Sequence, residues 1–491
     1  MSSGLEWRVT MPDGASVKLL PELGIIRRAW TMILALFLAL ESKMTSFAKK
    51  AWKTGMDEPK KVIHCLKVGM GLSLVSLFYY TRPLYDGVGG NAMWAVMTVV
   101  VVFEYTVGGT LYKGFNRATA TLLAGSLGVG VHWLAIKSGN DGEPVILGAS
   151  LFILASAATF SRFLPEVKSR FDYGVSIFIL TFSLVSVSGY RVDKLFDLAQ
   201  QRLLTIAIGT SMCILISILV FPVWAGNDLH LLITRNLDKL AESVDGCISE
   251  YFNEETARGE EEPTCKKSQS YKCVLNSKAS EESLANLARW EPGHGRFGFR
   301  YPWKQYLKIG TAMRHCACCL EALSGCINSE IQAPDFIKKH LSEGCKKLSS
   351  NSTDVLKELS SIIKSMKRSP NIDSLLANMS ASVDDLQNTL TSLTNQTLLS
   401  PPPPSPVLPG DSPENQSEPT HESMVDVPLM GVLPVVTIAS LLIEIASRIE
   451  DVTDTVDDLA ALADFKAAED LSNDEPPVVD ENENMKTLQE V

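Results

Sequence analysis

The sequence predicts an all-α, multi-pass membrane protein, with six transmembrane helices and a C-terminal cytosolic helical domain. Three observations predict this fold class. The mean hydropathy of the 491-residue chain is +0.10, which is high for a soluble protein of this size. Six apolar stretches follow one another between residues 62 and 223. After Asp228 the apolar residues recur with the helical period of about 3.6 and leave a polar face.

The two parts of the chain also differ in charge. Residues 1–224 contain 21 Lys and Arg against 14 Asp and Glu, a net charge of +7, and the remainder contains 24 against 42, a net charge of −18, which together give the −11 of the whole chain. A basic apolar part followed by an acidic polar part is typical of a membrane domain with a soluble appendage. The acidity argues against binding to nucleic acid.

Residues 1–56 are expected to form an N-terminal cytosolic segment with an amphipathic helix. The apolar run MILALFLAL, residues 32–40, is followed by no small-residue cleavage site and therefore does not resemble a signal peptide. With nine residues it is also shorter than a normal membrane span. An interfacial helix is the favoured interpretation, and a short membrane anchor is the alternative.

Residues 57–225 are predicted to form a six-helix transmembrane domain. Its apolar stretches lie at about 62–80, 92–109, 118–136, 145–161, 174–190 and 203–223. Most of them reach the roughly 17–25 residues that a spanning helix needs. Ten Lys and Arg residues fall in the segments on one side of these spans and five on the other. The positive-inside rule therefore places both termini in the cytosol.

The polar part of the chain is predicted to be helical as well. Residues 226–400 are expected to form a cytosolic domain of amphipathic helices, and the proline-rich residues 401–423 a linker. Residues 424–471 begin with an apolar run, but its helical periodicity continues into acidic sequence, so we expect a helix that packs on the cytosolic domain instead of a seventh span. Residues 472–491 have the composition of an acidic, disordered tail.

Cations stand where apolar stretches begin. Lys113 and Arg117 are four residues apart, share one helical face and lead into the third stretch. Arg202 begins the sixth stretch from the opposite side, where the positive-inside rule asks for no cation. Two interpretations stay open. Lys113 and Arg117 mark the cytosolic side of the membrane, or the three cations attract anions to a pathway through it.

Two further charged residues lie near the same ends of the apolar stretches. Lys67 lies one turn into the first stretch, where it either snorkels to the inner interface or supports the pathway. Glu104 is a lone acid at the end of the second stretch. It either pairs with Lys113 or Arg117 and holds them in place, or lies exposed at the interface.

Enzymatic chemistry has no candidate residues. The cluster RHCACCLEALSGC, residues 314–326, is the one metal-like grouping, but its side chains follow a burial stripe and lack the C-x2-C repeats of a zinc site. The glycines near residue 108 and at 125–130 are followed by no Lys-Ser/Thr of a phosphate loop, and small residues such as Gly125 and Gly128 indicate close helix packing. We therefore predict no catalytic residue, no metal and no cofactor.

Several stretches together resemble the plant aluminum-activated malate transporter family. In the apolar part they are DEPKKVIHCLKVG (57–69), GGNAMWAVMTVVVVFEYTVGGTLYKGFNR (89–117), FDYGVSIFILTFSLVSVSGYR (171–191) and LVFPVWAGNDLH (219–230). In the polar part, VLNSKASEESLANLARWEPGHGRFGFRYPWKQY (274–306) contains the family's Trp-Glu-Pro motif as Trp290, Glu291 and Pro292. The similarity extends from about residue 50 to 330 and recurs near 430–465.

This resemblance implies a homodimeric anion channel with six spans per subunit, embedded in membrane lipid, that passes malate and inorganic anions by electrodiffusion. It implies that Arg117 and Arg202 line the conducting path, with Lys113 near the inner mouth. A coupled organic-anion carrier and a membrane-anchored interaction or signalling scaffold are the alternatives. The plasma membrane is favoured over the vacuolar membrane, although the sequence shows no recognisable targeting signal that distinguishes the two.

The resemblance also points to acids on the outer side of the membrane. Members that respond to aluminum are thought to use such acids, and the matching positions are Asp86, Asp193 and Asp197. Hard oxygen ligands suit a small trivalent cation. Asp193 stands where a longer acid is expected, and Lys194 lies beside it, which weighs against activation by aluminum.

Overall fold

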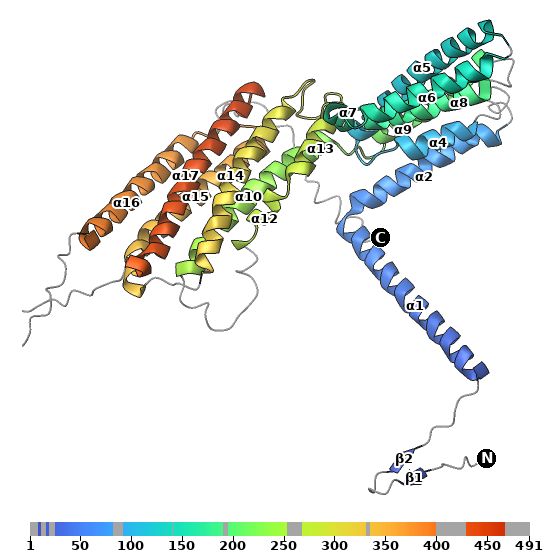
Figure 1. The fold of residues 1–491 in the computed structure, drawn as a ribbon. Coiled ribbons are helices and arrows are strands. Elements are labelled where there is room, and N and C mark those ends of the chain that lie inside the picture. Colours follow the sequence, from blue (N-terminus) through green and yellow to red (C-terminus); the bar gives the residue numbers. More distant parts are fainter. Residues whose placement is uncertain are drawn as a thin grey trace, which may run out of the picture.

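The structure is a computed structural model that describes residues 8–10, 16–18, 25–81, 92–139, 141–189, 195–252, 268–329, 334–398 and 429–466. These residues form two helical bundles and a long N-terminal helix that extends away from both (Figure 1). The helical fold class is confirmed. An antiparallel pair of short strands, β1 (Arg8–Thr10) and β2 (Ser16–Lys18), is an exception that the all-α prediction missed.

The first of these bundles, called the apolar bundle below, follows the hydrophobic stretches of the sequence. It contains α2 (Pro59–Tyr80), α4 (Ala92–Val102), α5 (Val107–Lys137), α6 (Glu143–Ser161), the short α7 (Pro165–Arg170), α8 (Asp172–Gly189) and α9 (Leu195–Leu219). α5 lies at its centre and packs against α6, α8 and α9, while α4 packs against α2 and α9. Within the described residues, α5 and α6 are long and apolar enough to cross a membrane, and α4, α8 and α9 contain shorter apolar segments.

One predicted boundary in this bundle is wrong. The second apolar stretch was expected to continue to residue 109 and the third to begin at 118, but α4 ends at Val102 and α5 begins at Val107. The reason is local: the side chain of Thr106 accepts a hydrogen bond from the backbone N–H of Gly109 at 3.1 Å and so caps a new helix. Arg117 consequently lies well inside α5 and does not open it.

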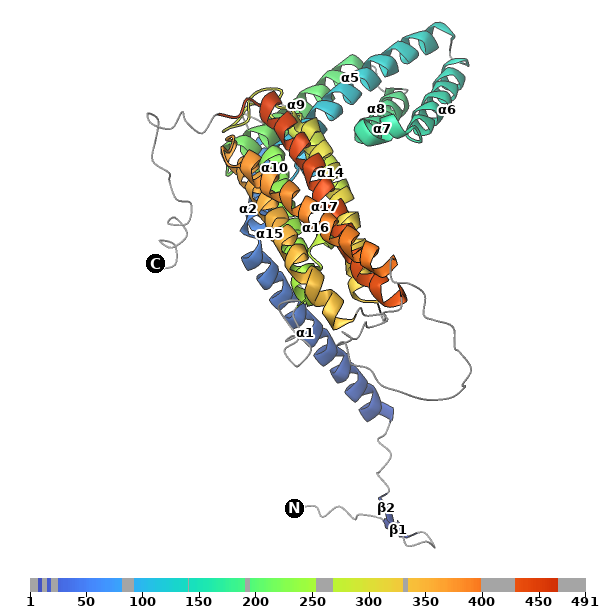
Figure 2. The ribbon, with the colours of Figure 1, turned by 90° about the vertical axis from the view of Figure 1, so that its left-hand side faces the viewer.

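The other bundle, called the polar bundle below, consists of amphipathic helices that bury their apolar faces against one another. It contains α10 (Ala225–Phe252), α12 (Tyr271–Leu275), α13 (Lys278–Ala288), α14 (Trp303–Ile327), α15 (Asp335–Ser365), α16 (Ile372–Leu398) and α17 (Leu429–Leu462). The long helices run side by side (Figure 2), with α10 on α15 and α14 on α17. Their buried side chains form one continuous core from Ala225 to Phe465.

Helix α17 combines an apolar composition with a packed position. Its segment Val432–Leu462 is long and apolar enough to cross a membrane. However, Val435, Ile438 and Leu442 are fully buried in the core of the polar bundle, and α17 packs on both α14 and α15. The apolar run therefore supplies one wall of that core.

Helix α1 (Ile25–Asp57) is exposed along almost all of its described residues. It contains the apolar run 32–40 but is much longer than that run. Its aromatic side chains point outward, with Trp30, Phe37 and Trp52 each exposed by 65% or more. Only Glu58 separates α1 from α2, where the direction of the chain changes sharply (Figure 1).

Candidate functional site

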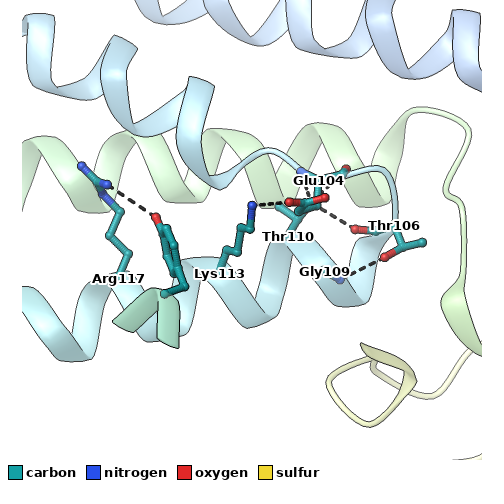
Figure 3. A network of polar contacts seen from close by, with 7 residues as sticks. Glu104, Thr106, Gly109, Thr110, Lys113 and Arg117 are labelled. Atoms are coloured by element: carbon teal, nitrogen blue, oxygen red, sulfur yellow. Dashed lines mark hydrogen bonds and ion pairs between the residues drawn. The ribbon is translucent and has the colours of Figure 1, made fainter. Parts of the chain in front are cut away.

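The first turns of α5 position the charged residues that follow. Thr110 donates its hydroxyl to the backbone carbonyl of Thr106 at 3.1 Å and accepts the backbone N–H of Glu104 at 3.1 Å. The connection from α4 is thereby folded back onto α5 (Figure 3). This arrangement carries the side chain of Glu104 to the helix face that holds Lys113.

Lys113 is a neutralised cation. Its ammonium group forms an ion pair with the carboxylate of Glu104, and the two side chains point toward one another in Figure 3. The Nζ atom also lies 5.5 Å from the centre of the Tyr173 ring, within the range of a cation–π contact. Both charges are partly exposed, so the pair lies at the rim of the apolar bundle.

Arg117, one turn further along α5, is a buried cation with few partners. It is 6% exposed. Its Nη1 atom donates a long hydrogen bond of 3.5 Å to the hydroxyl of Tyr173, while its Nε atom has no hydrogen-bond partner among the described residues. Among the residues that the structure describes, no acid forms an ion pair with it. A buried charge without a counter-charge is costly, so it needs a reason beyond packing.

A small cavity of about 20 Å³ adjoins Arg117. This volume is enough for about one water molecule. The lining is mostly apolar, with two threonine hydroxyls, and comes from helices α4, α5, α8 and α9: Trp94, Arg117, Thr121, Ile177, Leu180, Thr181, Leu184 and Ile206. The guanidinium therefore lies where four helices of the apolar bundle meet.

Small residues bring these helices close together. A Cβ atom on Gly114 would lie 2.7 Å from Thr210 of α9, and one on Gly128 would lie 2.7 Å from Val185 of α8. Larger residues at either position would push α5 away from its neighbours. The prediction of close packing therefore holds for Gly128, whereas no described residue of this chain lies within 4 Å of a Cβ atom at Gly125.

Lys67 does not snorkel to the interface. It is 3% exposed, and its Nζ atom donates a hydrogen bond of 2.6 Å to the backbone carbonyl of Phe221, in the connection between α9 and α10. Phe221 has a positive φ of 39°, so this connection turns sharply. Lys67 thus ties α2 to the point where the apolar bundle ends and the polar bundle begins.

The remaining predicted residues lie partly or wholly outside the described part of the chain. Arg202 and Asp197 belong to α9, but their side-chain positions are not among those described. Asp86 and Asp193 lie outside the described residues altogether. The structure therefore places Lys113 and Arg117 one turn apart on α5, brings Glu104 of the α4–α5 connection to Lys113, and does not test the outer acids.

The Trp-Glu-Pro motif forms the joint between the two bundles. The carboxylate of Glu291 accepts three backbone N–H groups: Oε1 accepts those of Ala225 at 2.6 Å and Gly108 at 3.3 Å, and Oε2 accepts that of Gly226 at 3.0 Å. These donors belong to the first turns of α10 and α5, whose N-terminal N–H groups have no partner within their own helices. One carboxylate therefore caps a helix in each bundle, where the helix dipoles favour a negative charge.

The side chain of Glu291 is almost inaccessible to solvent. It is 1% exposed, and burial raises the pKa of its carboxyl group, although the backbone hydrogen bonds and the nearby His294 oppose that rise. His294 in turn stacks on Trp224 with ring centres 3.8 Å apart. The carbonyl of Pro292 lies 2.9 Å from the Nδ1 atom of His294 and helps to orient it.

Aromatic contacts complete this joint. The ring of Trp290 lies 5.7 Å from that of Tyr112 and 5.3 Å from that of Phe115, both on α5. Gly108 is required here, because a Cβ atom at that position would collide with the backbone carbonyl of Leu287 on α13. The helix that carries Lys113 and Arg117 is thus held directly by the polar bundle. Sequence reasoning missed this contact and Tyr173, because neither has a local pattern.

The described residues include several apolar helices that are long enough to cross a membrane, which is typical of a helical integral membrane protein. The comparison with known proteins is more specific. The sequence profile described as "Aluminium activated malate transporter" matches residues 52–402, and the chain belongs to the aluminium-activated malate transporter family. The resemblance found in the sequence is thereby confirmed, and the family is one of transporters and not of enzymes.

The similarity to individual members of the family extends over most of the chain. Aluminum-activated malate transporter 10 of Arabidopsis thaliana is 52% identical over 96% of this chain and 98% of its own length. Aluminum-activated malate transporter 2 of the same plant is 44% identical over 86% of this chain and 79% of its own length. Aluminum-activated malate transporter 1 of Triticum aestivum is 40% identical, over 92% and 93% respectively.

Proposed function

We propose that this protein is an anion channel that passes malate and inorganic anions by electrodiffusion across a plant cell membrane. The names of its relatives support malate as a permeant. The observation that carries the proposal is Arg117, a guanidinium that is 6% exposed, without a described counter-ion, where α4, α5, α8 and α9 meet. A passing anion supplies the missing negative charge.

In this mechanism Arg117 and Arg202 line the conducting path and Lys113 lies near its inner mouth. Each cation replaces part of the hydration that a dicarboxylate loses on entering the apolar bundle. Conduction requires weak binding at several places, and a lone arginine in an apolar wall provides partial compensation only. Glu104 holds Lys113 through their ion pair, and Lys67 supports the path by fixing the α9–α10 connection.

The proposed topology assigns six spans to α2, α4, α5, α6, α8 and α9. Both termini and the polar bundle face the cytosol, and α17 is not a span because its apolar face is already covered. Helix α1 lies at the membrane surface, where its exposed aromatic side chains contact lipid. We further propose a homodimer in the plasma membrane, with Asp86, Asp193 and Asp197 on the outer side as a cation site.

The test is a recording of malate currents in cells that lack such currents of their own. Arg117→Ala and Arg202→Ala are each expected to reduce the malate current roughly tenfold, the order of about 1.4 kcal/mol of lost stabilisation. Arg117→Lys should retain part of the current, because it keeps the charge. Arg448→Ala is the matched control, since Arg448 lies on the surface of α17 in contact with Glu444 and Asp451.

Surface labelling must show equal amounts of each variant. Parental currents in both Arg117→Ala and Arg202→Ala would contradict the proposed path and leave the cations as markers of topology. The reversal potential separates the alternatives. A current that reverses with the malate gradient indicates a channel, a saturable flux tied to protons indicates a coupled carrier, and neither indicates a scaffold.

A further inference from the structure

A basic pocket lies on the polar bundle, beside the joint made by Glu291 but separate from the cations of α5. Its volume is about 650 Å³. The lining comes from the loop after α13, the first turns of α14 and the last residue of α17. The residues that matter for its chemistry are Arg289, Arg300, Lys304, Lys308, Phe299 and Tyr301.

The charge of this pocket is opposite in sign to the net charge of the polar part of the chain. Residues 225–491 contain 42 acids against 24 Lys and Arg, yet the pocket gathers four cations, Arg289, Arg300, Lys304 and Lys308. None of these four forms an ion pair with a residue that the structure describes. Glu291 is the one acid of the lining, and both of its carboxylate oxygens accept hydrogen bonds from backbone N–H groups. Nearby Asp458 accepts a hydrogen bond of 3.3 Å from Gln305.

Helix α14 adds a second source of positive potential. Its first residues, Trp303 to Gln305, line the pocket. The N-cap residue is Pro302, which makes no side-chain capping bond, and the first turn contains no acid. The helix's own first turn therefore contributes no negative charge to offset the positive end of its dipole, a condition that favours a bound anion.

The backbone at the pocket is strained. Arg300 has a φ of +65°, a left-handed conformation that few residues other than glycine adopt. Its guanidinium lies 5.6 Å from the centre of the exposed Phe299 ring. Residues held in such conformations cluster at ligand sites, where the surrounding structure maintains the strain.

We propose that this pocket binds a small oxyanion with two or more negative charges, whose phosphate or carboxylate groups pair with Arg289 and Arg300. Guanidinium groups offer two parallel N–H donors to such groups, and Lys304 and Lys308 supply further charge. The same chemistry can come from a free cytosolic metabolite or from the headgroup of an acidic phospholipid. This site is independent of the conducting path, and its test measures binding alone.

The experiment is calorimetric titration of the full-length protein purified in detergent, with sodium pyrophosphate and sodium citrate as soluble probes at constant ionic strength. A second arm measures binding to phosphatidylcholine vesicles with and without phosphatidylinositol 4-phosphate. Arg289→Gln/Arg300→Gln removes the two guanidiniums. Lys346→Gln/Lys357→Gln is the control, because it removes two exposed cations of α15, away from the pocket.

Saturable binding in either arm, weakened at least tenfold in Arg289→Gln/Arg300→Gln but unchanged in the control, supports the site. Binding to the soluble probes identifies a free anion, and binding only to the vesicles with phosphoinositide identifies a headgroup. Equal binding by the pocket variant and the control would overturn the proposal, as would no saturable binding in either arm. Equal unfolding temperatures of the three proteins exclude a loss of folding as the cause.

Discussion

The two bundles satisfy their buried charges in different ways. In the polar bundle, the fully buried Glu281 bonds to Arg314 at 2.6 Å and to the hydroxyl of Ser277 at 2.6 Å. Glu291 is likewise saturated by backbone N–H groups. In the apolar bundle, Arg117 is 6% exposed, and its Nε atom has no hydrogen-bond partner in the part of the chain that the structure describes. A saturated buried charge is explained by the structure around it, whereas an unsaturated one requires a further explanation.

The surfaces of the two bundles also differ in how many of their large apolar side chains are covered. The apolar bundle leaves large side chains uncovered, among them Met93, Phe152 and Phe160, each exposed by 70% or more. Its buried hydrophobic cluster around Val99 is small, whereas the polar bundle has a continuous core. The polar bundle therefore completes its packing within one chain. The apolar bundle needs lipid or a second copy to cover it.

The largest expected effect tests whether a saturated charge is structural. Arg314→Leu leaves the carboxylate of Glu281 buried without its cation, and we expect a loss of about 3–5 kcal/mol in unfolding free energy. In a bundle of this size that lowers the unfolding temperature by about 10 °C. Thermal unfolding of the purified full-length protein measures it.

Two further variants sharpen this comparison. Adding Glu281→Gln to Arg314→Leu removes the unpaired charge and should recover much of the loss. Arg117→Leu is the matched change in the apolar bundle, and it should leave the unfolding temperature unchanged or raise it. An equal loss in Arg117→Leu would show that Arg117 is structural and would remove the contrast between the bundles.

The next effect concerns a buried base in the polar bundle. His230 lies 2.9 Å from the hydroxyl of Tyr306, and burial lowers the pKa of His230 to about 4. Because the folded pKa lies below the unfolded value of 6.5, the unfolded chain takes up the proton first as the pH falls. The neutral, buried His230 makes its full contribution to the free energy of unfolding above about pH 6.5. About 3 kcal/mol of this contribution is lost by pH 4. Denaturant unfolding at several pH values should show this slope, and His230→Gln should lack it.

A smaller effect is expected at the joint between the bundles. Glu291→Gln keeps the shape of the side chain, but its amide nitrogen replaces one of the two accepting oxygens and removes the negative charge. It therefore loses either the N–H of Gly226 or those of Ala225 and Gly108, and the bonds to both helix starts are weakened. An unsatisfied buried donor costs about 1–3 kcal/mol. Hydrogen exchange should therefore become faster at the first turns of α5 and α10, while the centre of α15 keeps its protection. Unchanged exchange at both helix starts would mean that Glu291 does not hold the joint.

The sequence predicted more of the fold than of the site. Hydrophobic periodicity located the apolar helices and the amphipathic α17, because each pattern lies within one element. It did not locate the start of α5, where the cap of Thr106 overrides a continuous apolar pattern. The strands β1 and β2 were also missed, although the dipeptide Asp13-Gly14 between them is a known hairpin signal.

The features of the site that the sequence did not reveal depend on contacts between residues far apart in the chain. Glu291 bonds to residues 66 and 183 positions away in the sequence, so no local spacing could reveal that it caps two helices. The motif was recognised by resemblance, but its physical role required the structure. Similarly, Lys67 follows the pattern of a snorkelling residue, yet its partner is the carbonyl of Phe221, 154 residues away.

The last prediction is that enzymatic deglycosylation causes no shift in gel mobility. It tests which side of the membrane the polar bundle faces. Four glycosylation sequons, at Asn351, Asn378, Asn395 and Asn415, lie in the polar part of the chain. A cytosolic polar bundle is never exposed to the glycosylation machinery, so enzymatic deglycosylation should leave the gel mobility unchanged. The packing agrees for Asn351, whose amide donates to Ser382 at 2.7 Å across α15 and α16.

An acceptor sequon inserted between α5 and α6, on the proposed outer side, is the positive control. A shift in the parent protein would place the polar bundle outside and reverse the proposed direction of the path past Arg117.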